Sequence, residues 1–577
     1  MEAAAAEGRS LERVVSQKAL QMSSSRSCQV CVLAFLSGVC LTSLFMAGAA
    51  ASFRINNAAH FPFSLFSSMP STLIDDNLGE EHVTYSEKDN ISISTSDDNV
   101  SSLYTAWSHL LHESRDKEGP HHPRKIISSE SSNVPKAPHL EDCKTSIHMN
   151  RNLDMRIPNR TYPPWTLWKG TLDSVRKSAN DERLDQFTDR VVSEGAYPPW
   201  VIGSDEENYP LTRKVQRDLW LHQHPANCND PSVKFLVADW EKLPGFGIGA
   251  QLAGMCGLLA IAINEKRVLV TGYYNRADHD GCKGSSRSSW SCYFFPETSL
   301  ECKKRAYELM HEKAAWQTGV ITRKENYTSK DIWSGRIPRV WGRPWSIMQP
   351  TTEINGTLIV RHRKMDRRWW RAQAIRYLMR FQTEYTCDIM NKARHSAFGR
   401  EAAKMVLESS SENLRRKEHD DMEKFVWSNH KPWVPRPLLS IHVRMGDKAC
   451  EMTVFGFEDY MRLANKARMR FPHLKNVWLS TEMQDVIDKS KSYGQYWKFY
   501  YTNVTRQTGN MLMAAYESSL GRETSSNYPL VNFLMAVEAD FFIGALGSTW
   551  CFLIDGMRST GGKVMSGYLS VNKDRFW

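Results

Sequence analysis

The feature that most constrains the fold is a repeated alternation of short apolar runs and helix-like segments after residue 233. Lys234–Asp239 and Arg267–Thr271 are rich in β-branched residues, and Gln251–Asn264 between them has a helical pattern. Further strands are expected at Leu438–Val443, Asn476–Ser480, Trp497–Tyr501 and Asp540–Ala545. Helices are expected between and after them at Glu458–Phe471, Met483–Ser492, Leu530–Val537 and Trp550–Met557. This order is typical of βαβ units, so we expect an α/β fold with parallel sheets in two lobes, 233–434 and 435–577.

An apolar segment near the N-terminus, Cys28–Phe53, contains no charged residue. Its 26 residues are enough to cross the hydrocarbon core of a membrane, which is roughly 30 Å thick. Basic residues precede it and acidic residues follow, so the positive-inside rule places residues 1–27 in the cytoplasm. The alternative is a cleaved signal peptide, because Ala47–Ala49 offers a small-residue cleavage site. We expect a retained type II anchor, with the remaining chain in the lumen of the Golgi.

Composition narrows the class of protein. The mean hydropathy of −0.48 excludes a polytopic membrane protein. The chain has 74 Lys and Arg against 64 Asp and Glu, a net charge of +10, which suits an anionic ligand. No block of basic residues resembles a nucleic-acid-binding arm, so we expect no nucleic acid partner.

Residues 54–140 are rich in Ser, Asp and Asn, and we expect a flexible stem there, followed by an N-terminal extension of the catalytic region at 141–232. Nine cysteines follow the anchor, and in an oxidising lumen several should form disulfides. Cys282, Cys292 and Cys302 are the expected local staple of a loop. Six N-glycosylation sequons also follow the anchor, at Asn90, Asn99, Asn159, Asn326, Asn355 and Asn503.

Charged residues gather directly after the strand Leu438–Val443. The sequence reads His442, Val443, Arg444, Met445, Gly446, Asp447 and Lys448, with Glu451 one turn further on. Ligands of open α/β sheets bind at the carboxyl ends of strands. An arginine there can hold a phosphate and stabilise the charge of a leaving group. A solvated surface loop is the alternative interpretation.

Two small-residue loops precede expected helices. Ser548 and Thr549 begin the helix after the last expected strand, and free backbone N–H groups at a helix start can bind an anion. Gly245, Gly247 and Gly249 precede the helix of the first lobe. Gly245, Gly247 and Ala250 match the dinucleotide pattern formally, but the next strand lacks the acidic residue that would bind a ribose. We expect backbone approach to an anionic ligand, with ordinary turn and capping roles as the alternative.

Two further patterns have competing interpretations. Asp278-His279-Asp280 is a triplet of the type that holds a divalent metal on a sugar diphosphate. It lies in a loop rich in Cys and Ser without a clear strand before it. Asp366–Arg376 places two tryptophans beside four arginines on a helix, and we expect these tryptophans to fill the core.

Together these motifs resemble the α1,6-fucosyltransferase family over about residues 233–557. Gly245–Leu252 is similar to the family's glycine-rich turn, and Trp369–Gln373 with Tyr377–Arg380 to its WWxxQxxxYLxR helix. His442–Lys448 resembles its HVRRTDK motif, and Ala539–Phe541 with Ser548 resembles its C-terminal nucleotide motif. The resemblance implies a GT-B-like pair of facing Rossmann-type lobes, a GDP-fucose donor, a glycan acceptor, inversion at the anomeric carbon and no metal or other cofactor.

The resemblance also implies roles for single residues. His442 and Asn532 would face the guanine, and Arg444 would bind the β-phosphate. Glu451 would be the base, helped by Lys448, with Asp447 beside them. Gly245, Gly247, Gly249, Ser548 and Thr549 would line the donor site. The sequence departs from the family at Met445, Gly446, Met483 and Asn532.

We therefore expect an inverting glycosyltransferase that moves a sugar from a GDP-sugar to a glycan hydroxyl. One alternative is a non-catalytic descendant that binds glycans or nucleotides. The other is a metal-dependent transferase that uses Asp278 and Asp280.

Overall fold

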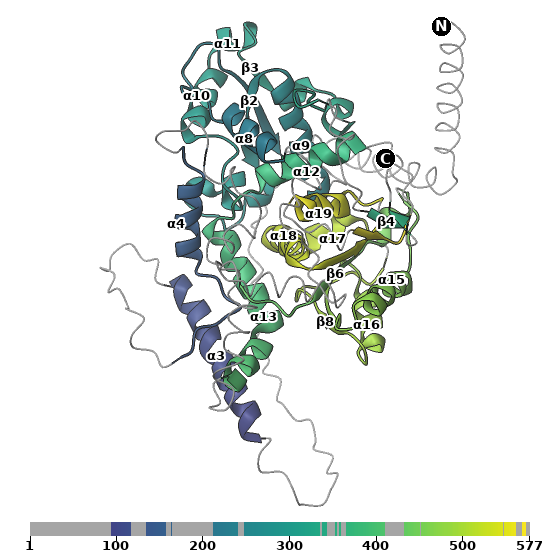
Figure 1. Ribbon diagram of the computed structural model, residues 1–577. Helices are drawn as coiled ribbons and strands as arrows, with labels where there is room; N and C mark the ends of the chain where they lie inside the picture. Colours follow the sequence, from purple (N-terminus) through teal and green to yellow (C-terminus); the bar gives the residue numbers. More distant parts are fainter. Residues whose placement is uncertain are drawn as a thin grey trace, which may run out of the picture. The chain divides into compact units, whose positions relative to one another are not determined.

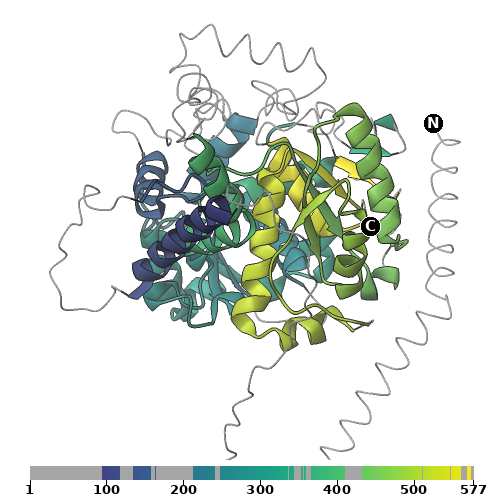
Figure 2. The same ribbon diagram turned by 90° about the horizontal axis from the view of Figure 1, so that it is seen from below.

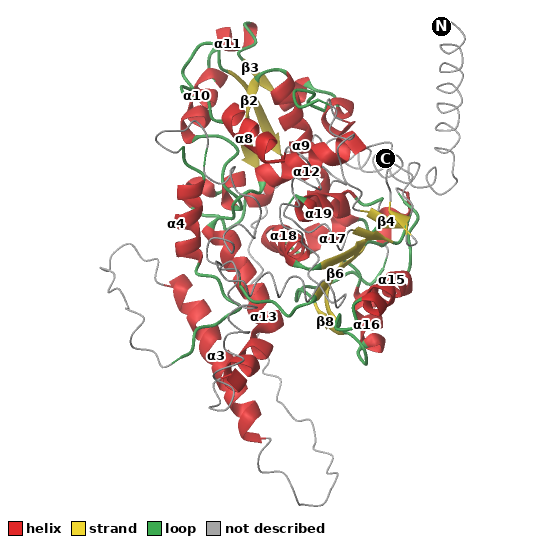
Figure 3. Ribbon diagram, in the orientation of Figure 1, coloured by secondary structure: helices red, strands yellow, loops and turns green. Residues whose placement is uncertain are grey.

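The computed structural model combines parallel β-sheets with helices (Figures 1 and 3). It describes residues 94–116, 134–156, 163, 212–240, 247–334, 337–342, 352–354, 357–358, 365–409, 432–450, 452–509, 511–545, 547–560 and 568–572. The expected anchor at 28–53 lies outside these residues. Within them, no helix has the length and apolar character that a membrane span requires.

The first sheet has three parallel strands, β1 (Lys234–Trp240), β2 (Arg267–Tyr274) and β3 (Ile321–Arg323), in the order β2-β1-β3. Helix α9 (Ile248–Asn264) connects β1 to β2 and is buried along almost its whole length. Its Gly257 is required by close packing, since a Cβ there would lie 1.8 Å from the carbonyl oxygen of Ile332. The predicted strand–helix–strand unit is confirmed. Helices α8 (Thr212–Gln223), α10 (Leu300–Met310) and α11 (Lys313–Gln317) belong to the same part of the chain.

The second sheet has the strand order β5-β4-β10-β9-β6-β7-β8. Its strands are β4 (Thr352–Ile354), β5 (Thr357–Leu358), β6 (Leu438–Val443), β7 (Asn476–Thr481), β8 (Lys498–Tyr500), β9 (Phe541–Gly544) and β10 (Tyr568–Ser570). All neighbours pair in parallel except β4 and β5. The four predicted strands are therefore confirmed. The second lobe was expected to begin at residue 435. Its sheet also includes β4 and β5, which come from residues 352–358, so the expected boundary does not separate the two sheets.

The helices described in the second half follow the predicted order, except that the one at Met513–Ser519 was not predicted. They are α15 (Phe457–Arg470), α16 (Gln484–Ser490), α17 (Met513–Ser519), α18 (Arg522–Glu538) and α19 (Thr549–Ser559). Helix α18 starts earlier than expected and contains Pro529. The short helices are η2 (Asn275–Ala277), η3 (Gly284–Ser286), η4 (Trp290–Cys292), η5 (Lys324–Asn326), η6 (Lys330–Ser334), η9 (Gly446–Cys450) and η10 (Lys491–Tyr493).

Helix α12 (Met365–Leu378) joins the two sheet regions by packing on both α9 and α19. Trp369 and Trp370 are fully buried, which confirms the prediction that these side chains fill the core. Gly556 of α19 permits this contact, since a Cβ there would lie 2.9 Å from the Cα of Ala372. Arg368 of α12 also forms a buried ion pair with Asp555 of α19.

The prediction of a flexible stem over residues 54–140 is wrong for residues 94–116. Helix α3 (Ser94–Asp116) packs along α13 (Glu384–Ser409), as Figures 1 and 2 show. Trp107 is fully buried in this contact, and its indole N–H donates to the carbonyl of Pro135 at 2.8 Å. A few apolar residues at helical spacing therefore order this polar segment. Helix α4 (Cys143–Leu153) follows.

Among the described residues, disulfides join Cys143 to Cys387, Cys228 to Cys302 and Cys282 to Cys292. The expected local staple is right for Cys282 and Cys292. It is wrong for Cys302, which lies on α10 and meets the cysteine that precedes β1. Of the sequon asparagines, Asn99, Asn326 and Asn503 are exposed. Asn90, Asn159 and Asn355 lie outside the described residues.

Candidate active site

Arg444 occupies the carboxyl end of β6, an inner strand of the second sheet. Its Nη1 donates to Glu482 Oε1 at 2.5 Å, and its Nη2 pairs with the carboxylate of Asp447. The side chain is 9% exposed. Burial alone lowers the pKa of Arg444, but the two carboxylates outweigh it and raise the pKa above its ordinary value. The guanidinium is therefore a fixed cation at the carboxyl end of β6.

Glu482 was not predicted as a site residue. It follows β7, which pairs in parallel with β6, so the ends of both strands meet at one sheet edge. Its Oε1 also accepts the backbone N–H of Met445 at 3.0 Å. The alternation of strands could have indicated this contact, because adjacent parallel strands end side by side.

Asp447 connects the end of β6 to α17. One carboxylate oxygen pairs with Arg444, and the other accepts the backbone N–H of Met513 at 3.1 Å. Asp447 therefore positions Arg444 and the start of α17. Lys448 is half-buried in η9, next to this pair. Glu451, the predicted base, lies outside the described residues.

His442 lies inside the protein near α19. Its Nδ1 contacts the sulfur of Cys551 at 3.2 Å. Burial, together with the charges of Arg444 and Lys448, lowers the pKa of His442 to about 3. The imidazole is therefore neutral at physiological pH and can present one donor and one acceptor.

The two small-residue loops predicted from the sequence come together. Helix α9 begins after Gly247, which has no side chain to cap it, and α19 begins after Ser548, whose side chain does not cap it. A Cβ on Gly249 would lie 3.0 Å from the indole of Trp550, and one on Gly247 would lie 3.5 Å from Glu517 Oε1. The start of α9, which follows a strand of the first sheet, therefore lies beside the start of α19, which follows a strand of the second sheet. Thr549 is the first residue of α19, and Gly245 lies outside the described residues.

Sequence reasoning missed Arg276, which follows β2. It is 5% exposed and donates to Gln251 Oε1 at 2.5 Å and to Glu517 Oε2 at 2.9 Å. A third contact reaches the carbonyl oxygen of Ser525 at 3.5 Å. Arg276 therefore ties the first sheet to α17 and α18. A single arginine beside an aspartate-rich loop gives no sequence signal for this role.

Asn532, expected to face a guanine, lies on α18 and is 3% exposed. Its Oδ1 accepts the indole N–H of Trp478 at 3.0 Å, and its Nδ2 lies 3.5 Å from Thr502 Oγ1. Both ends of the amide therefore contact protein groups.

The aspartates of the Asp278–Asp280 triplet face arginines. Asp278 pairs with Arg522 at 2.6 Å and with Arg287 at 3.3 Å, and Asp280 pairs with Arg287 at 3.3 Å. His279 turns to the hydroxyl of Tyr293 at 2.7 Å. In the described part of the chain, no three His, Cys, Asp or Glu side chains are grouped as metal ligands would be.

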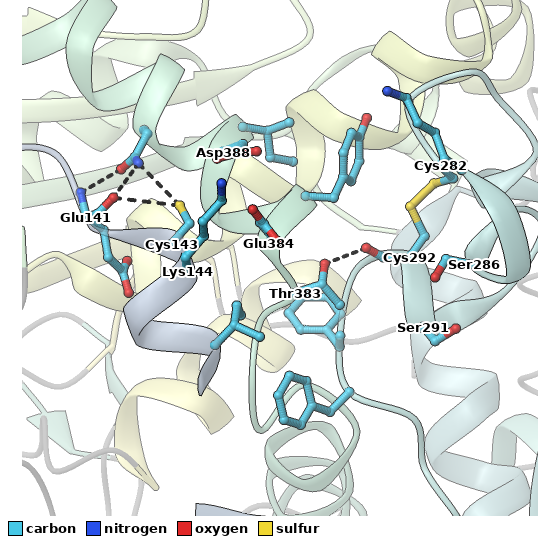
Figure 4. A pocket seen from close by; sticks show the side chains of 18 of the residues that line it. Glu141, Cys143, Lys144, Cys282, Ser286, Ser291, Cys292, Thr383, Glu384 and Asp388 are labelled. Atoms are coloured by element: carbon cyan, nitrogen blue, oxygen red, sulfur yellow. Dashed lines mark hydrogen bonds between the residues drawn. A yellow bond between two sulfur atoms is a disulfide. The ribbon is translucent and has the colours of Figure 1, made fainter. Parts of the chain in front are cut away.

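A cavity of about 1010 Å³ lies between α4, α13 and the loop around Cys282 (Figure 4). Two disulfides, Cys143–Cys387 and Cys282–Cys292, belong to its walls. Its lining mixes charged, hydroxyl and aromatic side chains, among them Lys144, Glu384, Asp388, Ser286, Ser291, Phe295 and Tyr385. This composition suits a polar ligand with many hydroxyl groups. We call this cavity the disulfide-walled groove.

No protein-family model matches the sequence, and a search of curated proteins gives no match. Among solved structures, the chain is similar to the NodZ α-1,6-fucosyltransferase soaked with GDP-fucose, with 12% identity, 56% of this chain and 92% of that chain covered, and a TM-score of 0.29. The chain is also similar to POFUT1 in complex with GDP-fucose. The identity is 11%, 61% of this chain and 100% of that chain are covered, and the TM-score is 0.27. A third similar structure is a mutant of Arabidopsis thaliana FUT1 in complex with GDP. Its identity is 10%, 61% of this chain and 75% of that chain are covered, and the TM-score is 0.27.

Proposed function

We propose that this protein is a glycosyltransferase that binds the diphosphate of a nucleotide sugar between its two sheet regions. One observation carries the proposal. The buried Arg444 cation lies after β6, and the start of α19, which Ser548 does not cap with its side chain, contacts His442 of that strand and the start of α9. A fixed guanidinium and helix starts are the groups that hold a phosphate and stabilise its charge as it leaves.

The proposed donor is GDP-fucose, on the strength of the sequence motifs. The proposed step is an inverting displacement. An acceptor hydroxyl oxygen forms a bond to the anomeric carbon while the bond from that carbon to the phosphate oxygen breaks, and its electron pair leaves with the GDP. Glu451, aided by Lys448, takes the hydroxyl proton. Arg444 and the helix N–H groups compensate the negative charge of the GDP, a role that does not require a metal.

We also propose that the acceptor glycan occupies the disulfide-walled groove. Its hydroxyl, carboxylate and aromatic side chains offer the hydrogen bonds and ring faces that sugars use, and two crosslinks keep its walls in place. The sequence further supports a Golgi location, with a single type II membrane anchor at 28–53.

A non-catalytic binding protein is the second candidate. The amide of Asn532 is already bonded to Trp478, so the expected contact with guanine competes with an existing one. The metal-dependent alternative is less favoured, because both of its aspartates are paired with arginines.

The test uses the full chain, purified in detergent. Calorimetric titration with GDP, UDP and ADP identifies the nucleotide, and incubation with GDP-fucose and other nucleotide sugars, with and without EDTA, follows hydrolysis and transfer. We expect GDP binding and EDTA-resistant turnover. Binding without turnover would support the non-catalytic candidate, and loss of turnover in EDTA would overturn the metal-free step. Absence of binding to any nucleotide would reject the proposed function.

A further inference from the structure

Gln507 has a buried side-chain amide without a partner. The residue is 5% exposed, and neither Nε2 nor Oε1 forms a hydrogen bond with any group that the structure describes. Buried amides normally have partners, since leaving one unsatisfied costs free energy. An unsatisfied buried group in a folded protein has a specific reason, and a binding role is one of them.

The backbone holds Gln507 firmly in place. Its N–H donates to the carbonyl of Glu482 at 3.0 Å, and its carbonyl accepts the N–H of Gln484 at 2.9 Å. These bonds fix the residue against the end of β7. The unsatisfied amide therefore belongs to a tightly held position.

The amide faces the Arg444 cluster across Gly446. A Cβ on Gly446 would lie 3.4 Å from Gln507 Nε2 and 3.7 Å from both Arg444 Nη1 and Glu482 Oε1. Gly446 has a φ of +59°, a left-handed conformation that favours glycine. Three polar side chains thus converge on a position where the chain has no side chain of its own.

The chemistry of an amide selects its ligand. A phosphate oxygen only accepts hydrogen bonds, so it would satisfy Nε2 and leave Oε1 without a donor. A sugar hydroxyl both donates and accepts, so neighbouring hydroxyls of one sugar ring can satisfy Nε2 and Oε1 together. The sugars bonded to a diphosphate in a nucleotide sugar are the ribose and the sugar to be transferred.

We propose that Gln507 binds a ring hydroxyl of the nucleotide sugar, next to the phosphate held by Arg444. This assignment rests on the proposed function, and gives Gln507 the role of a donor-specificity residue. Neither the sequence motifs nor the resemblance to fucosyltransferases points to this position.

The variant Gln507→Met tests the assignment, because it keeps the length of the side chain and removes both polar ends. We expect it to weaken binding about tenfold or more, the effect of losing one or two hydrogen bonds. We also expect its Tm to be unchanged or raised, since an unsatisfied buried amide is replaced by an apolar group. A purely structural glutamine would instead give a lower Tm.

Titration of the full chain with GDP and with GDP-fucose separates the two sources of the hydroxyl. Loss confined to GDP-fucose assigns Gln507 to the transferred sugar, and equal loss for both assigns it to the ribose. Gln484→Met is the matched control, because the Gln484 side chain bonds only to the exposed Asp488 among the described contacts, and its affinities should equal those of the parent.

Two results would overturn the assignment. If the parent binds both ligands and Gln507→Met binds them equally well, Gln507 does not contact the ligand. If Gln507→Met loses affinity only together with a lowered Tm, its role is structural. A parent protein that binds neither ligand would reject the proposed function itself, and the Gln507 assignment with it.

Discussion

At the scale of single residues, the site depends on charges that the protein has already paired. Arg444 lies between Glu482 and Asp447, and this arrangement holds its guanidinium in one orientation. A cation held in this way needs little reorganisation when an anion arrives, which is the basis of electrostatic preorganisation.

We expect Arg444→Ala to weaken GDP binding at least tenfold, because a charge-assisted hydrogen bond contributes about 1.5–3 kcal/mol. Its stability should also fall, since two carboxylates lose their cation. Arg444→Lys keeps the charge, so weaker binding by this variant at nearly normal stability would isolate the role of the guanidinium. Calorimetric titration and thermal unfolding measure both effects. The control is Arg462→Ala, which removes an exposed arginine paired with Asp459. Equal affinity of Arg444→Ala and the parent would contradict the role of Arg444.

Buried histidines make the stability depend on pH. Three buried histidines have low pKa values, and burial is the largest cause in each case. The pKa is about 3 for His442, about 3 for His139 and about 4 for His224. In the unfolded chain the same groups bind a proton near pH 6.5. Between about pH 6.5 and 4 the unfolded state therefore binds more protons, and stability falls as the pH falls.

We expect the Tm to decrease from pH 7 to pH 5, with each such histidine contributing up to about 1.4 kcal/mol per pH unit. His442→Asn should reduce this dependence, while the exposed His311→Asn should leave it unchanged. Thermal unfolding across this range tests the prediction. A steeper or equal slope in His442→Asn would show that His442 does not titrate as its surroundings imply.

At the scale of elements, the site depends on two helix starts that approach closely. Glycine at position 249 leaves room for Trp550 of α19, whereas a Cβ on Gly247 would only make an ordinary contact, 3.5 Å from Glu517 Oε1 of α17. The sequence shows glycines before a helix, but the contact that limits the size of residue 249 is known only once α19 is placed beside it.

We expect Gly249→Ala to destabilise the protein by about 1–3 kcal/mol, because its Cβ would lie 3.0 Å from the Trp550 ring. Adding Trp550→Ala should relieve part of this effect. Gly509→Ala is the matched control, since a Cβ there meets nothing within 4 Å. Chemical denaturation of the single and double variants measures the coupling. Additive effects of the two substitutions would argue against the close contact.

The disulfide-walled groove gives a second prediction for elements. Replacing Cys282 and Cys292 by Ser opens a short crosslinked loop and should cost about 2–3 kcal/mol. If the acceptor binds there, KM for the acceptor should rise while the affinity for GDP stays the same. Serine at Cys228 and Cys302 is the control, because this pair does not line the groove. An acceptor KM that rises equally in both double variants would count against the groove.

At the scale of the whole molecule, buried ion pairs connect the two sheet regions. Arg276 after β2 pairs with Glu517 of α17, and both side chains are at most 5% exposed. Arg368 of α12 pairs with Asp555 of α19 in the same way. Charges buried like this fix which surfaces meet, because a shifted arrangement would leave them unpaired.

We expect Arg276→Met to destabilise the protein by about 3–5 kcal/mol, since it leaves the Glu517 carboxylate buried alone. The double variant Arg276→Met with Glu517→Met should recover most of this loss. Urea denaturation followed by two probes measures stability and cooperativity. A double variant less stable than either single one would show that the pair itself is strongly stabilising.

Much of the sheet framework could be predicted from the sequence, and β6 was predicted to the residue at both ends. Parallel strands are buried on both faces, so their apolar runs are easy to recognise. Arg276 and Gln507 could not be found, because their roles come from neighbours distant in the chain. Glu482 could have been found, because β6 and β7 are adjacent parallel strands that end side by side. Strands β4 and β5 are too short to show a pattern, and the polar composition around α3 hid its apolar face.

The packing of α3 on α13 determines at which residue a shortened recombinant fragment of this protein should begin. Trp107 covers Ala402 and Ala403, all three completely buried. A recombinant fragment that begins near residue 140 would retain α13 with this surface uncovered and open to self-association. A fragment that begins before Ser94 keeps the helix in place, and is the better starting point for crystallisation.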